Sequence, residues 1–265
     1  MEGSGTVKTR LGSSLALVIM LTLGACTSGS GAAEAPASSA PTSSVADTTA
    51  PSETEPGPAV QNIMELEGFA PLEPGTYFID PDGDPSTPLR VVYEVPIEGW
   101  SMWIGAVKFA EDGHVGLSIS TVTNLVRHGC RDHSWADPPV GPSVNDLAAA
   151  LADLAPFRVM SPPKDETIYG YSGKHLELTV PDLPVKGEGD DRRFAGCVDG
   201  TLESWVAFIL GDAFYGYSEP GHTEDFWILD IEGIRLMIEA NWSPDSPRKD
   251  LAEMSAILDS IRIEP

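Results

Sequence analysis

Cations are scarce in this chain of 265 residues. Lysine and arginine number 16 against 40 aspartates and glutamates, which gives a formal net charge of −24 at pH 7. Such an acidic surface repels the phosphates of nucleic acids and of anionic lipid headgroups. We therefore expect no nucleic acid as a partner.

Recognisable catalytic motifs are also missing. The segment 170–173 lacks the second spacer of the G-x-S-x-G nucleophile motif, and the segment 216–221 has one residue too many. His175 follows Ser172 closely, but neighbours on one strand-and-turn segment are explained by structure alone. The sequence points to no catalytic residue and no cofactor, and whether the protein is an enzyme stays open, with a non-enzyme favoured.

An uncharged apolar run is present but short. Lys8 and Arg10 precede it, and residues 11–23 carry no charge. Thirteen residues span roughly 20 Å as a helix, less than the ~30 Å of hydrocarbon in a bilayer. This length is typical of the apolar core of a cleaved signal peptide.

The end of that run resembles the bacterial lipobox. Leu23, Gly24 and Ala25 stand directly before Cys26. In lipoproteins the signal is cut before this cysteine, whose sulfur receives a diacylglycerol and whose chain acquires fatty acids such as palmitate. The resemblance implies a signal peptide over 1–25 and a lipid anchor at Cys26. An ordinary signal peptide with an incidental cysteine is the alternative.

Residues 27–60 differ sharply in composition from the remainder of the chain. Of these 34 positions, 28 are Ala, Ser, Thr, Pro or Gly. Such a segment cannot bury enough apolar surface to offset its conformational entropy. We predict a lipid-anchored disordered linker over 26–62, with its ends about 30 Å apart. A single folded domain over 63–265 comes after it, on the extracytoplasmic face of the cell membrane.

Three cysteines are an odd number for an exported chain. Lipidation of Cys26 leaves Cys130 and Cys197, which an oxidising compartment favours as a disulfide. Closing so long a loop stabilises a fold by about 4 kcal/mol on the chain-entropy model.

Alternating apolar residues dominate the folded part and predict mainly strands. The clearest hairpin joins 226–230 to 234–241 through Glu232 and Gly233. Ser143 with Asp146 forms a capping box for one helix, and Ser246 with Pro247 begins a second. The order of these elements predicts an α+β fold, a mainly antiparallel sheet with two or three helices packed on it.

Four segments of the folded part share a pattern with a known family. They are 140–144, 173–180, 227–230 and 259–264. Together they resemble an actinobacterial cell-envelope domain of unknown function found in lipoproteins, a likeness that covers roughly residues 72–265. More distantly, Gly99 and Trp100 after a strand, with the closing helix and strand, are similar to the PsbP-like α/β/α sandwich. Neither family implies a catalytic residue.

One cluster could hold a metal. His128, Asp132 and His133 surround Cys130, and Asp137 follows shortly after. Imidazole and carboxylate groups are zinc ligands, but a disulfide would remove the thiolate and no further ligand stands at regular spacing. We predict no metal site and keep these residues as weak candidates.

The remaining hypothesis is a membrane-anchored, non-enzymatic domain that binds a small molecule, a glycan or a protein. The alternative is an envelope hydrolase or metal-binding protein with a site near His128 and His133. Aromatic residues could line a binding groove, although burial in the core is their usual fate. They are Trp100, Trp103, Trp135, Tyr215, Tyr217 and Trp242.

Lipidation at Cys26 is directly testable. Mass spectrometry of the membrane fraction should find a mature chain that begins at Cys26 and carries acyl groups. Cys26→Ser should block acylation and leave the precursor uncut. An unmodified Cys26 thiol, or intact precursor in the cytosol, would contradict the lipobox assignment.

Overall fold

The computed structural model describes residues 60–265, apart from 85, 112, 188–190, 212–213, 218 and the side chain of Phe208. The predicted signal peptide, Cys26 and nearly all of the predicted linker lie outside the described residues. Within the described part, no helix has the length and apolar character needed to cross a bilayer.

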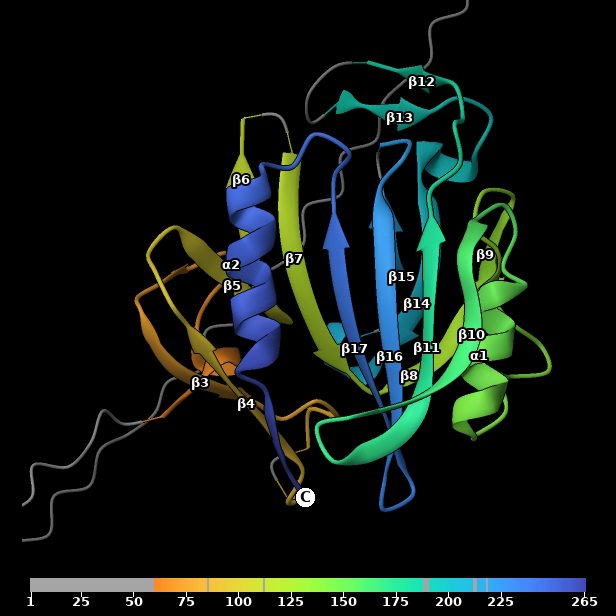
Figure 1. The fold of residues 1–265 in the computed structure, drawn as a ribbon. Coiled ribbons are helices and arrows are strands. Elements are labelled where there is room, and N and C mark those ends of the chain that lie inside the picture. Colours follow the sequence, from red (N-terminus) through yellow and green to blue (C-terminus); the bar gives the residue numbers. More distant parts are fainter. Residues whose placement is uncertain (1–59, 85, 112, 188–190, 212–213, 218) are drawn as a thin grey trace, which may run out of the picture. The chain divides into compact units, whose positions relative to one another are not determined.

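A large antiparallel sheet forms the centre of the described fold (Figure 1). Its hairpin between β16 (Thr223–Ile231) and β17 (Ile234–Trp242) turns at Glu232 and Gly233, both with positive φ, as a two-residue turn of this kind requires. In spatial order its eight strands are β10 (Arg158–Ile168), β11 (Tyr171–Thr179), β16 (Thr223–Ile231), β17 (Ile234–Trp242), β7 (Gly113–Ser120), β6 (Gly105–Ala110), β5 (Trp100–Trp103) and β2 (Pro71–Leu72).

Two four-stranded sheets and a short pair complete the strands. The first sheet orders β1 (Gln61–Asn62), β3 (Gly75–Ile79), β4 (Arg90–Val95) and β18 (Arg262–Glu264), with β1 and β3 parallel. The second orders β15 (Phe214–Tyr217), β14 (Leu202–Ala207), β8 (Val122–His128) and β9 (Asp132–Trp135). The pair is β12 (Val185–Lys186) with β13 (Arg193–Phe194), and short 3₁₀ turns lie at Ile63–Glu65, Val198–Gly200 and Phe208–Leu210.

One face of the large sheet packs against α2 (Arg248–Asp259) and the first small sheet. Met254 and Ile257 of α2 share a hydrophobic cluster with Leu117, Leu236 and Ile238 of the large sheet. Lys108 on β6 also reaches α2, with its Nζ 2.8 Å from Asp250 Oδ1. We call this side the α2 face.

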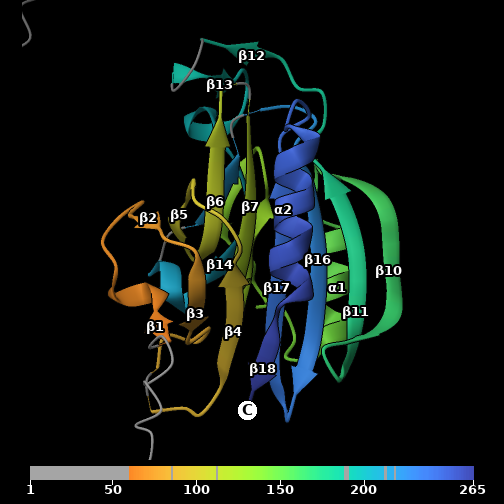
Figure 2. The same ribbon diagram turned by 60° about the vertical axis from the view of Figure 1, so that its left-hand side comes forward.

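The opposite face packs against α1 (Val144–Ala152) and the second small sheet. Leu147 and Leu151 of α1 share a cluster with Leu176, Ile228 and Met237. The cluster continues into β8, β14 and β15 through Leu125, Leu202, Trp205, Tyr215 and Tyr217. We call this side the α1 face, and Figure 2 shows the two helices on opposite sides of the sheet.

The antiparallel character of the sheet and the presence of two helices confirm the coarse expectation. The capping box of Ser143 and Asp146 is also present. The proportion of strands to helices differs from the expectation, however, because the fold is richer in strands than the predicted α+β class implied. Each helix shares its layer with a four-stranded sheet, so the layers are mixed and not the helical layers of an α/β/α sandwich.

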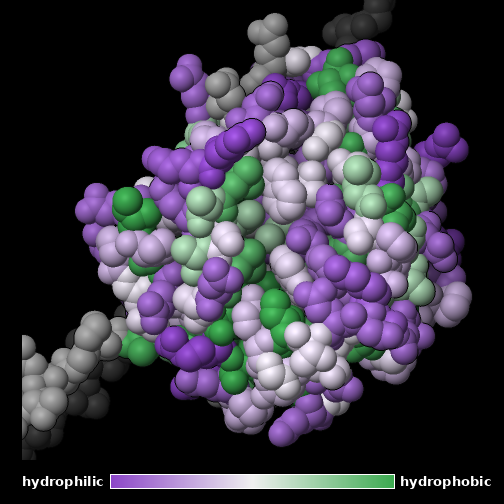
Figure 3. All heavy atoms as spheres, viewed as in Figure 1, coloured by the Kyte–Doolittle hydropathy of each residue, from purple (hydrophilic) through white to green (hydrophobic). Residues whose placement is uncertain are grey.

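Hydrophilic side chains cover most of the face seen in Figure 3, and hydrophobic ones form small patches between them. This agrees with the net charge of −24.

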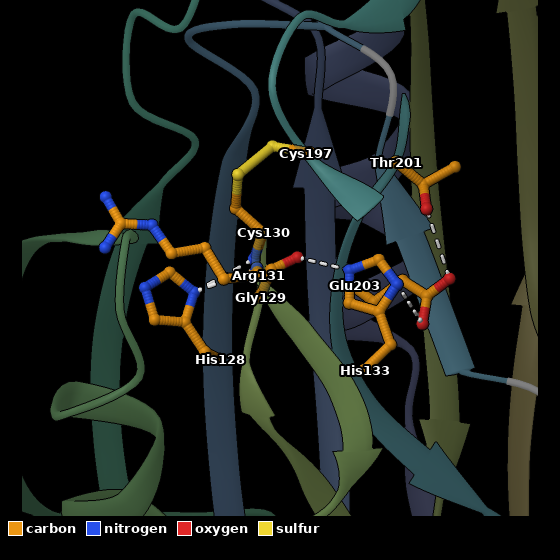
Figure 4. Close-up of a disulfide and its surroundings, with 8 residues drawn as sticks. All are labelled: His128, Gly129, Cys130, Arg131, His133, Cys197, Thr201 and Glu203. Carbon is orange, nitrogen blue, oxygen red and sulfur yellow. Dashed lines mark hydrogen bonds and ion pairs between the residues drawn. A yellow bond between two sulfur atoms is a disulfide. The ribbon is translucent and has the colours of Figure 1, made fainter. Parts of the chain in front are cut away.

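The predicted disulfide joins Cys130 and Cys197. It links the turn after β8 to the 3₁₀ turn that precedes β14, and backbone hydrogen bonds run beside it from Val198 N to Cys130 O and from Glu203 N to Gly129 O. Figure 4 shows His128 and His133 on either side of this bridge. The disulfide therefore secures one end of the second small sheet.

Removal of this bridge should destabilise the protein. Cys130→Ser/Cys197→Ser is expected to lower the free energy of unfolding by about 2–5 kcal/mol, because the unfolded chain regains the freedom that the loop removed. Urea unfolding of the oxidised protein and the double variant measures this. Equal midpoints would show that the bridge does not form in solution.

Candidate functional site

Polar side chains lie on the α1 face at one end of the large sheet. Glu224 on β16 pairs in register with Asn241 on β17, and Glu239 pairs with Ser118 on β7. All four are at most 1 % exposed. Gly116, opposite Asn241, leaves space for the amide, since a Cβ there would lie 2.8 Å from Asn241 Oδ1.

Two fully buried carboxyl groups form the deepest part of this region. Burial raises the pKa of Glu224 to about 8. Burial and the neighbouring charge of Glu224 raise the pKa of Glu239 well above its usual value. Since the oxygens of these two groups make no well-aligned hydrogen bond with the described residues, neutral carboxyl groups are the favoured form at pH 7.

Two tyrosines of β15, in the second small sheet, cover this region. Tyr215 accepts a hydrogen bond from Asn241 Nδ2 at 3.0 Å, and the Tyr217 hydroxyl lies 2.9 Å from Ser204 Oγ. Burial raises the pKa of each tyrosine, and the nearby glutamates raise it further. The hydroxyls therefore stay protonated and can donate or accept.

A cluster of imidazoles and a carboxylate adjoins these groups. Potential ligand atoms of His114, Glu219 and His222 all lie within 4.8 Å of one another. His222 Nδ1 is 3.5 Å from Glu219 Oε1, and His222 Nε2 is 2.9 Å from Glu224 Oε1. Ser243 Oγ donates to Glu219 and lies 3.2 Å from His114 Nδ1.

The charges of this cluster follow from its surroundings. Burial, with the nearby charge of His222, lowers the pKa of His114 to about 4. Burial opposes ionisation of Glu219, but hydrogen bonds from His222 and Ser243 outweigh it and bring its pKa to about 2. Arg192 adds a further contact, with its Nη1 3.2 Å from Glu219 Oε2. Glu219 is thus ionised and His114 neutral at pH 7.

An aromatic pocket opens beside the cluster. Its volume is about 270 Å³, and its walls come from β5, β6, β7, β15, β17, the segment before β2 and the 3₁₀ turn after β14. Most of its lining is apolar, whereas His114, Asn241 and Tyr215 supply polar atoms. The other lining residues are Phe69, Trp103, Val107, Phe109, Gly116, Leu210, Phe214 and Gly216.

His128 and His133, the metal candidates from the sequence, contact the backbone near the disulfide. His128 Nδ1 accepts hydrogen bonds from the backbone N–H groups of Cys130 and Arg131, and His133 Nε2 lies 2.8 Å from Gly129 O (Figure 4). His133 Nδ1 also lies 3.4 Å from Glu203 Oε2. These side chains hold the β8–β9 hairpin beside the disulfide.

The two aspartates of that candidate set are also engaged locally. Asp132 accepts hydrogen bonds from the backbone and hydroxyl of Ser134, and Asp137 lies 3.5 Å from Arg127. In the described part of the chain, the group with the spacing of metal ligands is the cluster at His114 and not this one.

His175 does not meet Ser172. Its Nε2 lies 2.5 Å from Asp225 Oδ1 and its Nδ1 3.2 Å from Glu166 Oε2, while its ring stacks on Trp227. Ser172 instead lies 3.5 Å from Thr167 Oγ1. The histidine is therefore held between two carboxylates on the α2 face.

The aromatic residues named from the sequence divide among three places. Trp103 and Tyr215 line the pocket, whereas Trp100 and Trp242 join the core under α2. Tyr217 is buried beside the carboxyl pair, and Trp135 is exposed on β9. The structure brings only two of these six residues to one pocket.

A wider hollow lies near the start of α1, and its cations are already engaged. Its volume is about 460 Å³. Arg235 Nη2 donates to Val122 O at 2.9 Å and its Nη1 to Gly141 O, while Lys174 Nζ lies 2.7 Å from Asp165 Oδ1. Those contacts favour a structural role, so the aromatic pocket is the better candidate.

Comparison with known proteins gives little. No protein-family model matches the chain, and no curated protein matches it either. Among solved structures, the chain is similar to LpqN of Mycobacterium tuberculosis, described as involved in cell envelope biogenesis. The identity is 12 %, the TM-score is 0.30, and the match covers 77 % of this chain and 95 % of that one. A likeness of this size carries no argument about function.

Most residues of the site were missed in the sequence. His114, Glu219 and His222 are distant in sequence and share no spacing motif. A usable signal was present for the carboxyl pair, because Glu224 alternates with apolar Phe226 and Ile228 on one side of a strand. A charged residue in such an apolar series indicates either a strand end or an enclosed polar site.

The buried carboxyl pair predicts an inverse dependence of stability on pH. The pKa of Glu239 is higher in the folded chain than its ordinary value of 4.5. Above pH 4.5 the folded state then binds more protons than the unfolded state, so stability falls as the pH rises. Glu239→Gln, which cannot ionise, should be more stable than the native chain at pH 8, by roughly 1–3 kcal/mol.

Urea unfolding at pH 5 and pH 8 measures this, with exposed Glu264→Gln as the matched control. The control should keep the native pH dependence. A Glu239→Gln variant with the native pH dependence would show that this carboxyl group is not held neutral.

Proposed function

We propose that this protein is a lipid-anchored, extracytoplasmic binding protein whose aromatic pocket takes a small, largely apolar molecule. The observation that carries the proposal is the pocket itself, with exposed aromatic rings at its rim and polar groups at its inner wall. The anchor and the compartment rest on the lipobox resemblance at Cys26.

The rim offers apolar surface that a ligand would cover. Phe69 and Phe109 are 56 % and 58 % exposed. Phe69 stacks on Trp103 with ring centroids 5.3 Å apart and nearly parallel planes, and Phe109 meets Phe69 edge to face at 5.6 Å. Covering such rings stabilises a complex by about 25 cal/mol per Å² of apolar surface.

The size and polarity of the pocket limit its ligand. A volume of about 270 Å³ lies just below the usual range for drug-sized ligands, so one or two rings or a short acyl segment fits. His114, Asn241 and Tyr215 can hydrogen-bond one polar end of the molecule. A net charge of −24 disfavours an anionic ligand.

The predicted linker fits this role. A flexible segment of about 30 Å would hold the domain close to the membrane surface. A molecule that partitions between a bilayer and water is then within reach of the pocket. The proposed activity is therefore capture or transfer of an apolar ligand at the membrane surface.

Hydrolysis is a weaker second candidate. Ser243 Oγ lies 3.2 Å from His114 Nδ1, an arrangement that can activate a serine. Ser243 is only 1 % exposed, however, and its hydroxyl donates to Glu219. A substrate carbonyl cannot reach this oxygen in the described conformation, so binding is the better-supported function.

The neutral aromatic probe N-phenyl-1-naphthylamine tests the pocket by its gain in fluorescence. The native chain should bind it saturably at one site. Phe69→Ser/Phe109→Ser should weaken binding roughly tenfold or more, since two aromatic contacts are each worth about 0.5–1.5 kcal/mol.

Trp135→Ser is the matched control, because Trp135 is an exposed aromatic residue on β9. It should bind the probe as the native chain does. No saturable binding to the native chain, or equal loss in the control, would contradict the assignment of this pocket.

A further inference from the structure

We infer that His114, Glu219 and His222 form a binding site for one zinc ion beside the aromatic pocket. The inference concerns the ion alone and does not depend on which molecule the pocket takes. It rests on the composition of the cluster, on the groups behind it and on its position.

The composition of the cluster suits zinc. Two imidazoles and one carboxylate are a common three-residue ligand set for zinc, with water or another ligand in the fourth position. The potential ligand atoms lie within 4.8 Å of one another, and His222 Nδ1 and Glu219 Oε1 are 3.5 Å apart. Ligands of a tetrahedral zinc stand about 3.4 Å apart, so side-chain shifts of about 1 Å would complete the set.

The contacts of His222 support this role. Its Nε2 lies 2.9 Å from Glu224 Oε1, and both side chains are almost completely buried. A zinc ion at Nδ1 would take the place of the contact with Glu219 and leave the ring proton on Nε2, beside the Glu224 carboxyl group. Metal-bound histidines usually keep their second nitrogen next to such a partner, which fixes the tautomer and the ring orientation.

The Glu219 carboxylate also presents one oxygen to the histidines. Its Oε1 lies 3.5 Å from His222 Nδ1, and the buried Glu224 lies on the other side of that ring. Among the described residues, Arg192 is the non-histidine cation at ion-pair distance from Glu219, and it contacts Oε2. Zinc at Oε1 would therefore bind this carboxylate on the side away from Arg192.

The position of the site gives it a possible ligand partner. His114 both belongs to the cluster and lines the aromatic pocket. Its ring lies 6.1 Å from that of Phe109 and 4.9 Å from that of His222, between the rim and the buried groups. An ion held there could use its fourth position for the polar end of a pocket ligand.

Calorimetric titration of the purified full-length chain, stripped with a chelator, tests the inference. Zn²⁺ should bind with a stoichiometry of one, and Mg²⁺ and Ca²⁺ should not bind at the same site, because hard cations prefer oxygen ligands. His114→Gln and Glu219→Gln should each weaken zinc binding at least 100-fold. His128→Gln should leave it unchanged.

Nuclear magnetic resonance of the native chain with ¹⁵N-labelled histidine avoids variants that fail to fold. One equivalent of Zn²⁺ should shift the ring nitrogens of His114 and His222 and leave those of His128, His133 and His175 in place. Absence of stoichiometric binding to the native chain, or shifts confined to His128 and His133, would overturn the inference. Both results are independent of whether the naphthylamine probe binds.

Discussion

Burial of both faces of one large sheet is the constraint from which the rest of this structure follows. A sheet with one exposed face could leave polar side chains in water on that side. Here α2 and one small sheet cover the first face, and α1 with another small sheet covers the second. Polar residues on the α1 face, such as Glu224 and Glu239, are consequently enclosed away from water, which favours the neutral form of their carboxyl groups.

The enclosed groups explain why the site lies where it does. Asn241 donates a hydrogen bond to Tyr215 of β15 beside the carboxyl pair. His222 lies between Glu224 of that pair and Glu219. The aromatic pocket adjoins these polar groups, and His114 of β7 lines it. The side chains thus change along this region. Neutral buried acids come first, the neutral His114 and the ionised Glu219 follow, and exposed aromatic rings lie at the surface.

Local features of the fold were predictable from the sequence, and its layers were not. The turn at Glu232 and Gly233 and the capping box at Ser143 depend on neighbouring residues, so their patterns are visible in the chain. Strand β8 has no clear alternating pattern in the sequence, because Thr123, Asn124 and Arg127 interrupt its apolar residues. Helix α2 begins at Arg248, with Pro247 and not Ser246 at its cap, since Ser246 Oγ donates to His114 O.

The site was less predictable for a physical reason. Arg235 and Glu239 alternate with apolar residues on β17, a pattern that indicates one exposed face in an antiparallel strand. The covering sheet is built from β8, β14 and β15, and neither β8 nor its pairing could be derived from local sequence. His128 and His133 are close together in the chain, which is why they were metal candidates. In the structure both side chains contact the backbone of the β8–β9 hairpin next to the disulfide.

Infrared spectroscopy tests the central claim most directly, because a protonated carboxyl group absorbs separately from a carboxylate. At pH 7 nearly all carboxyl groups of such an acidic chain are ionised. The account predicts a protonated-carboxyl band in the native protein at this pH, and its loss in Glu224→Gln/Glu239→Gln. A native spectrum without that band would contradict an enclosed, neutral carboxyl pair between the layers.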